Sequence, residues 1–120
     1  MLTTLHYADS LETPQNSKFR ADYRDKFGKE ADIYAVQGYD TGLLLAQSLA
    51  KVNGNTKDRA AWNAAMADAR IDSPRGVWSF SKAHNPVQNI YLREVRDGAN
   101  VVVSTAVAAL ADPAPGCKLQ

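Results

Sequence analysis

The chain has 120 residues, of which 45% are hydrophobic and 22% are charged, and its 14 Lys and Arg against 13 Asp and Glu leave a formal charge of +1. These values are typical of one ordinary globular domain, and they exclude a dedicated nucleic-acid binder, which needs a strongly basic face. No stretch approaches the roughly eighteen consecutive apolar residues of a membrane-spanning helix, and the single cysteine, Cys117, permits neither an internal disulfide nor a cysteine-based metal site.

The first elements along the chain are a strand and a helix. Residues 3–7 are rich in strand-forming residues, and a turn-rich connector follows them. Phe19, Tyr23 and Phe27 recur four residues apart with charged residues between them, and Gly28 stands where a helix C-cap is expected. We therefore predict a short strand and then an amphipathic helix over residues 16–27.

Two more helices are expected after a polar break at residues 29–32. Residues 34–52 form a longer and more apolar helical pattern, which the Asn-Gly-Asn-Thr run at residues 53–56 ends. Either Thr56 or Asp58 then caps a third helix, which we expect to continue through Ala69.

The remaining third of the chain has the alternation of strands. Residues 76–80 and 89–95 alternate apolar and polar positions on either side of a turn-rich loop. A third apolar run at residues 100–104 follows the turn signal Asp97-Gly98. We predict an antiparallel hairpin or a three-stranded meander, followed by a loosely ordered tail over residues 106–120.

Two segments of the sequence resemble one protein family. They are AVQGYDTG at residues 35–42 and DSPRGVWSFSKAHNPVQNIYLREV at residues 72–95. Both resemble the C-terminal region of the leucine/isoleucine/valine-type solute-binding proteins, the type I periplasmic components of ABC importers. The likeness extends from about residue 9 to residue 95.

The resemblance implies an α/β fold, namely an incomplete type I lobe with three helices followed by a short antiparallel hairpin or meander. Members of the family are several times longer, and they trap a solute between two lobes by hinge closure. Residues 1–120 would then be one partial domain, with lobe crossings at residues 3–8 and 91–95. Because strands on which this part packs would be absent, we expect exposed apolar faces on the helix at residues 34–52, covered in a homodimer or a swapped assembly.

The same resemblance implies a function in transport and no enzymatic activity. The ligand would be a small carboxylate-bearing solute, either an amino acid or an aromatic acid, delivered to an ABC transporter permease. The location would be periplasmic, although the N-terminal residues have neither the charged nor the apolar region of a secretory signal.

Three residues at the start of the long helix are the candidate ligand-binding residues. Tyr34 matches the position of an aromatic that lines the ligand cleft in the family, and it offers a flat face and a hydroxyl. Gln37 and Tyr39 follow on the first turns, where unpaired helix N–H groups favour a carboxylate. The pair of tyrosines favours an aromatic acid, and a purely structural role remains the alternative for each of the three.

Other polar residues are interpreted as structural. Arg75 and Gly76 precede a strand, and glycine there permits a turn that a Cβ would strain. His6 and His84 have no second His or Cys at ligand spacing, so we expect solvated loop residues and not metal ligands. Catalytic and phosphate-binding motifs are absent from the sequence, and we expect neither a cofactor nor a metal.

Two alternatives to a solute-binding protein stay open. A structural or self-associating fragment would assemble with itself or with a missing lobe and bind no solute. A sensory domain of the same fold would bind a similar ligand but signal to a receptor or an operon.

Overall fold

Capping side chains set the ends of the helices. The computed structural model describes residues 1–118, with the helices α1 (Pro14–Phe27), α2 (Ile33–Lys51) and α3 (Arg59–Ala67). Thr13, Asp32 and Asp58 each accept a hydrogen bond from a first-turn amide, and Gly28 ends α1 in the left-handed region with a φ of 66°. The three predicted helices are confirmed, and Asp58 is the cap of the third.

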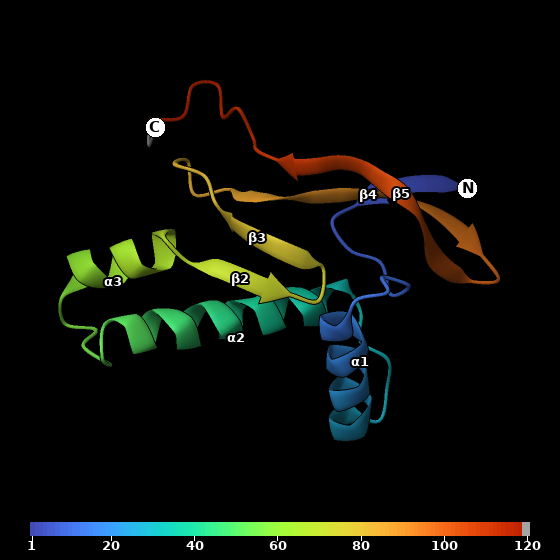
Figure 1. Cartoon of the computed structure of the whole chain (residues 1–120), viewed down its shortest axis with the longest axis horizontal. Helices are drawn as coiled ribbons and strands as arrows, with labels where there is room; N and C mark the ends of the chain where they lie inside the picture. The colour runs from blue at the N-terminus through green and yellow to red at the C-terminus, as the bar shows by residue number, and fades with distance from the viewer. Residues whose placement is uncertain (119–120) are drawn as a thin grey trace.

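The strands form one antiparallel sheet, which α2 and α3 line along one side (Figure 1). Its strands are β1 (Leu2–Leu5), β2 (Arg70–Ser73), β3 (Gly76–Phe80), β4 (Pro86–Arg96) and β5 (Ala99–Leu110). The order is β1-β4-β3-β2, and β5 also pairs with β4. Leu5 lies opposite Tyr91, so the two segments expected to cross between lobes are neighbours in the sheet.

The sheet contains one strand that the sequence pattern does not predict. The expected third helix continues to Ala69, but α3 ends at Ala67 and β2 begins at Arg70. Ala69 and Ile71 are buried with Trp78, and Ile71 pairs with Trp78 across β2 and β3. A strand of four residues is too short to show alternation, and its partner strand decides its conformation.

The first and last strands along the chain also differ from the prediction. β1 ends at Leu5 and not at residue 7, because Tyr7 turns away from the sheet and is buried against α1. β5 continues to Leu110, five residues into the segment 106–120 that we expected to be loosely ordered. Gln88 pairs with Leu110, and the amide of Ala109 donates to the side chain of Asn89. Residues 111–118 contain no helix or strand, and residues 119–120 lie outside the described part.

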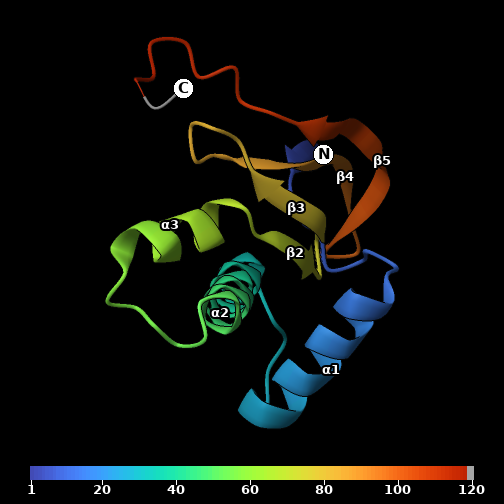
Figure 2. The ribbon, with the colours of Figure 1, turned by 60° about the vertical axis from the view of Figure 1, so that its left-hand side comes forward.

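The described chain is flat and not fully compact. Its extents are 50 × 39 × 18 Å and its radius of gyration is 16.0 Å, compared with about 14 Å for a compact domain of this length. Two small clusters form the core, one around Tyr7, Phe19 and Val36 and the other around Ile71 and Trp78. Figure 2 shows α2 end-on, with the sheet and the other helices on part of its circumference.

Exposed apolar side chains on α2 are confirmed. Leu45 and Leu49 are 42% and 37% exposed, on the side of the helix away from the core clusters. In residues 1–118 we find no helix with the length and apolar character needed to cross a bilayer.

Candidate functional site

The three candidate ligand-binding residues lie on the first turns of α2 but do not form one cluster. Tyr34 is 76% exposed, and Gln37 is exposed beside it. At 3.6 residues per turn these two side chains point only about 60° apart around the helix, whereas Tyr39 points about 140° away from Tyr34. The ring of Tyr39 packs on Phe19 of α1, with 4.9 Å between ring centroids. Tyr34 and Gln37 therefore share one open surface, and Tyr39 anchors the helix to α1.

The N-terminus of α2 already holds a negative group. The carboxylate of Asp32 accepts a hydrogen bond of 2.8 Å from the amide of Ala35. It therefore uses one of the N–H groups that a ligand carboxylate would need, and its charge opposes an anion at this helix end. A carboxylate-bearing ligand would meet its donors on the Tyr34 and Gln37 side, or outside this chain.

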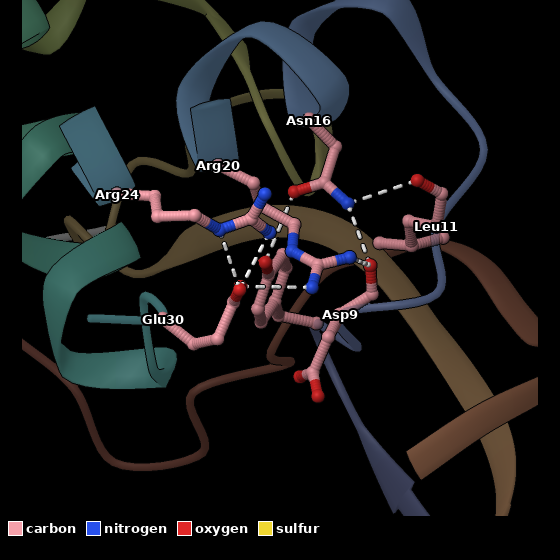
Figure 3. Close-up of polar contacts among 7 residues, drawn as sticks. Asp9, Leu11, Asn16, Arg20, Arg24 and Glu30 are labelled. Atoms are coloured by element: carbon pink, nitrogen blue, oxygen red, sulfur yellow. Dashed lines mark hydrogen bonds and ion pairs between the residues drawn. The ribbon is translucent and has the colours of Figure 1, made fainter. Parts of the chain in front are cut away.

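The loop that leads into α2 is held by two arginines of α1. Figure 3 shows Glu30 between Arg20 and Arg24, at 3.0 Å from Arg20 Nη2 and 2.7 Å from Arg24 Nε. These two hydrogen bonds lower the pKa of the Glu30 carboxyl below its usual range. Since Tyr34 comes four residues after Glu30, this contact sets where the candidate surface begins.

A buried amide fixes the segment between β1 and α1. Asn16 is 1% exposed, and its Nδ2 donates to the carbonyl oxygens of Asp9 and Leu11 at 3.0 and 2.9 Å (Figure 3). The hydroxyl of Tyr7 donates to Asn16 Oδ1 at 3.0 Å, and burial raises the pKa of Tyr7 to about 12. Both the nitrogen and the oxygen of the Asn16 amide are thus hydrogen-bonded, and these bonds hold the segment between β1 and α1 in place.

A buried ion pair fixes α2 on the sheet. Arg75 Nε lies 2.6 Å from Asp40 Oδ2, and the two side chains are only 7% and 3% exposed. Trp78 Nε1 also donates to Asp40 Oδ2, at 3.0 Å, and the Arg75 guanidinium lies over the Trp78 ring at 4.8 Å from its centroid. Arg75 Nη1 donates further to the Gln88 side chain.

The same arginine connects the helix to β4. The hydroxyl of Tyr91 donates to the carbonyl oxygen of Arg75 at 2.7 Å. Gly76 has a φ of 103°, and a Cβ there would lie 3.0 Å from that hydroxyl. The predicted structural roles of Arg75 and Gly76 are confirmed, and they link α2 through β4 to its neighbour β1.

The two histidines differ in environment. His84 is exposed in the turn before β4, as predicted. His6 is not a solvated loop residue, because its Nε2 is buried without a hydrogen-bond partner. Burial, and then the charge of Arg75, lower the pKa of His6 below its usual range. No group of metal-ligating side chains occurs in residues 1–118.

Two hollows of the surface lie away from the candidate residues. A mainly apolar cavity of about 320 Å³ lies between α2, α3 and the loop after β3, with Leu44, Met66 and Phe80 in its wall. A wider groove of about 640 Å³ follows residues 9–14 and one side of α1. Neither of these two hollows is lined by Tyr34, Gln37 or Tyr39.

Comparison with known proteins identifies the family. The family model described as "Periplasmic binding protein" matches residues 1–100. The chain belongs to the periplasmic binding protein family. Leu/Ile/Val-binding protein homolog 6 of Brucella abortus and of Brucella suis is 37% identical over 98 residues, which are 79% of this chain and 25% of the relative.

Solved structures of family members retain the same arrangement. An ABC transporter solute-binding protein of Rhodopseudomonas palustris in complex with benzoate is 43% identical, with a TM-score of 0.92 over 98% of this chain and 33% of its own. A second, from Rhodopseudomonas palustris BisB5 in complex with 3,4-dihydroxy benzoic acid, is 32% identical, with a TM-score of 0.84 over 96% of this chain and 32% of its own. This periplasmic binding protein chain thus spans a quarter to a third of the length of these relatives, and the predicted α/β partial lobe is confirmed.

The polar contacts that position α2 were not predicted. The Glu30 contact and the Asp40 ion pair join residues that are 6 to 35 positions apart in the sequence. Asp40 stands in the AVQGYDTG run and Arg75 in the second family run, so the resemblance was the one signal that marked both.

Proposed function

We propose that the chain forms one wall of the ligand site of a periplasmic ABC-importer binding protein, and that the ligand is a small aromatic carboxylate. Tyr34 carries the proposal, because it is an exposed aromatic at the position that the family resemblance assigns to the ligand cleft. The relatives at 43% and 32% identity were solved with benzoate and 3,4-dihydroxy benzoic acid. An aromatic ring of the ligand would stack on Tyr34, and the Gln37 amide offers a hydrogen bond beside it.

The same proposal covers how the ligand is held and where it is delivered. The ligand would be trapped in a cleft between two lobes, with delivery to an ABC transporter permease in the periplasm and without enzymatic turnover. Tyr39 would act from the second turn, where it holds α2 against Phe19. The name of the Brucella relatives makes an aliphatic amino acid the competing ligand class.

The test uses a grafted protein in which this chain replaces the matching third of the Rhodopseudomonas palustris benzoate-bound relative. Calorimetric titration compares benzoate, 4-hydroxybenzoate and leucine. We expect Tyr34→Ala to weaken benzoate binding about tenfold or more through loss of stacking, and Tyr34→Phe to retain most of it. Phe27→Ala is the control, because Phe27 is an aromatic that is 55% exposed at the far end of α1. Unchanged affinity of Tyr34→Ala for benzoate would show that this residue is not part of the site. Tighter binding of leucine than of benzoate would show that the ligand class is an aliphatic amino acid.

A self-associating fragment is the second candidate function. The exposed Leu45 and Leu49 favour it, because contiguous apolar surface on α2 tends to become buried in an assembly. Sedimentation velocity of the 120-residue chain alone, over a range of concentrations, distinguishes a homodimer from a monomer.

A further inference from the structure

The cavity between α2, α3 and the loop after β3 has a wall built from separate segments of the chain. Asn63, Met66 and Ala67 lie on one face of α3, because they are three and four residues apart. Leu44 comes from α2, and Phe80 is the last residue of β3. The loop between β3 and β4 lies beside α3 in both views (Figures 1 and 2). The tertiary fold thus assembles the cavity.

The apolar part of the wall belongs to the second core cluster. Leu44 and Phe80 pack against this cluster, and the ring of Phe80 meets the ring of the buried Trp78 edge-on, with 5.1 Å between centroids. The Met66 thioether adds a group that makes favourable contacts with aromatic rings. The cavity volume of about 320 Å³ is at the lower end of the range of about 300–1,000 Å³ for ligand pockets. These features fit a molecule with one aromatic ring.

Hydrogen bonds hold the loop that carries His84 at the cavity. The amide of His84 donates to the carbonyl oxygen of Ser81 at 2.9 Å, and the amide of Ser81 donates to that of Asn85 at 2.8 Å. The side chain of Asn85 donates to Asp112 Oδ2 at 2.8 Å. His84 has a φ of 62°, in the left-handed region that non-glycine residues rarely adopt. The position of His84 is therefore set by the loop backbone.

The polar part of the wall is uncharged. In residues 1–118, Asn63 and His84 are the polar residues that line the cavity, and no Asp, Glu, Lys or Arg does so. Neither side chain is hydrogen-bonded to another residue of this described part. Each can donate to or accept from a ligand hydroxyl. A carboxylate would lose hydration there without a charge to offset the cost.

We propose that this cavity is a second binding site, which takes an uncharged monocyclic aromatic molecule with a hydroxyl group, of the phenol type. Its ring would contact Met66 and Phe80, and its hydroxyl would bond to Asn63 or His84. The site is separate from the surface of Tyr34, because Leu44 lies ten residues further along α2, or about 15 Å along the helix axis. It is independent of the proposed function, since it requires no carboxylate ligand at Tyr34.

Met66 permits a local test, because Met66 and the 85% exposed Met1 are the two methionines of the chain. The 120-residue chain is labelled with ¹³C at the methionine methyl groups and titrated with phenol and, separately, with benzoate in an NMR experiment. Phenol should shift the Met66 signal in a saturable manner and leave the Met1 signal in place. Benzoate should need a concentration about tenfold higher or more for the same shift, because its charge is not compensated in the cavity.

Two variants and a matched control locate the binding. Ala67→Phe places a ring at the cavity wall and should abolish the saturable shift, whereas Ala61→Phe adds the same ring at an exposed position on the other side of α3 and should retain it. Circular dichroism checks that both are folded. The double variant Asn63→Ala with His84→Gly removes the polar side chains, and glycine accepts the φ of 62°. It should weaken phenol binding severalfold.

The same titration of the grafted protein shows whether the cavity stays open beside the rest of the family fold. Its Met66 signal is identified by its loss in Met66→Leu. A saturable phenol shift of Met66 in both proteins is expected. Absence of this shift from either protein, an equal response to benzoate, or a shift that Ala67→Phe retains would overturn the proposal. Unchanged phenol affinity of the double variant would overturn the role of the hydroxyl, and with it the phenol class.

Discussion

Replacement of Asp40 by Asn leaves the charge of Arg75 buried without a partner charge. The two side chains are 3% and 7% exposed, and the donor and acceptor atoms are 2.6 Å apart. Asparagine has nearly the same volume as aspartate, so the substitution changes the charge and leaves the packing against Trp78 in place. Its effect on stability therefore reports the electrostatics of the pair.

Loss of one member of a buried ion pair costs about 3–5 kcal/mol, because the remaining charge keeps its desolvation penalty and loses its attraction. Domains of this size have a total stability of about 5–15 kcal/mol. We therefore expect Asp40→Asn to remove a large part of the free energy of unfolding. A double variant, Asp40→Leu with Arg75→Met, should be less destabilised than the sum of its single changes, since no charge is then left buried.

Urea unfolding followed by far-UV circular dichroism measures these differences. Asp22→Asn is the matched control: Asp22 lies 2.6 Å from Lys18, the same distance as in the buried pair, but those side chains are 60% and 74% exposed. We expect little change in the midpoint for the control, because water screens an exposed pair. Equal effects of Asp40→Asn and Asp22→Asn would refute the assignment of burial as the cause.

Two further predictions concern the turn before β3 and the histidine after β1. Gly76→Ala should lower the free energy of unfolding by more than about 1 kcal/mol, because the φ of 103° strains an L-residue and the new Cβ would meet the Tyr91 hydroxyl at 3.0 Å. Gly42→Ala, in a helix with free space, should instead raise stability, and the same urea titration compares the two. The pKa of His6 lies below its usual 6.5, so below about that pH the unfolded chain binds a proton that the folded chain does not, and stability decreases on acidification. His6→Gln should reduce this decrease in unfolding curves between pH 7 and pH 5, and an unchanged pH dependence would show that other groups cause it.

The helices were predictable because their signals are local. Thr13, Gly28 and Asp32 bond to amides or carbonyls within a few residues of themselves. Both partners of each capping contact are therefore close together in the sequence. The exposed apolar face of α2, on which Leu45 lies, was expected from the family resemblance, because strands on which this helix packs would be absent. The candidate ligand residues Tyr34, Gln37 and Tyr39 came from the family resemblance, and their contact with a ligand stays a prediction.

Tertiary structure decided the features that depend on distant partners. β2 forms because Ile71 pairs with Trp78, and Tyr7 leaves the sheet because it bonds to Asn16 and packs with Phe19. The Nε2 atom of His6 is buried, which its local sequence does not indicate. Asp40 and Arg75 are 35 residues apart, and each alone is typical of a solvated charge. Capping and periodicity are properties of neighbouring residues, whereas the burial and pairing of a charge depend on which segments pack together. The sequence by itself therefore determined the helices and their faces. Only the tertiary structure determined how α2 is held on the sheet.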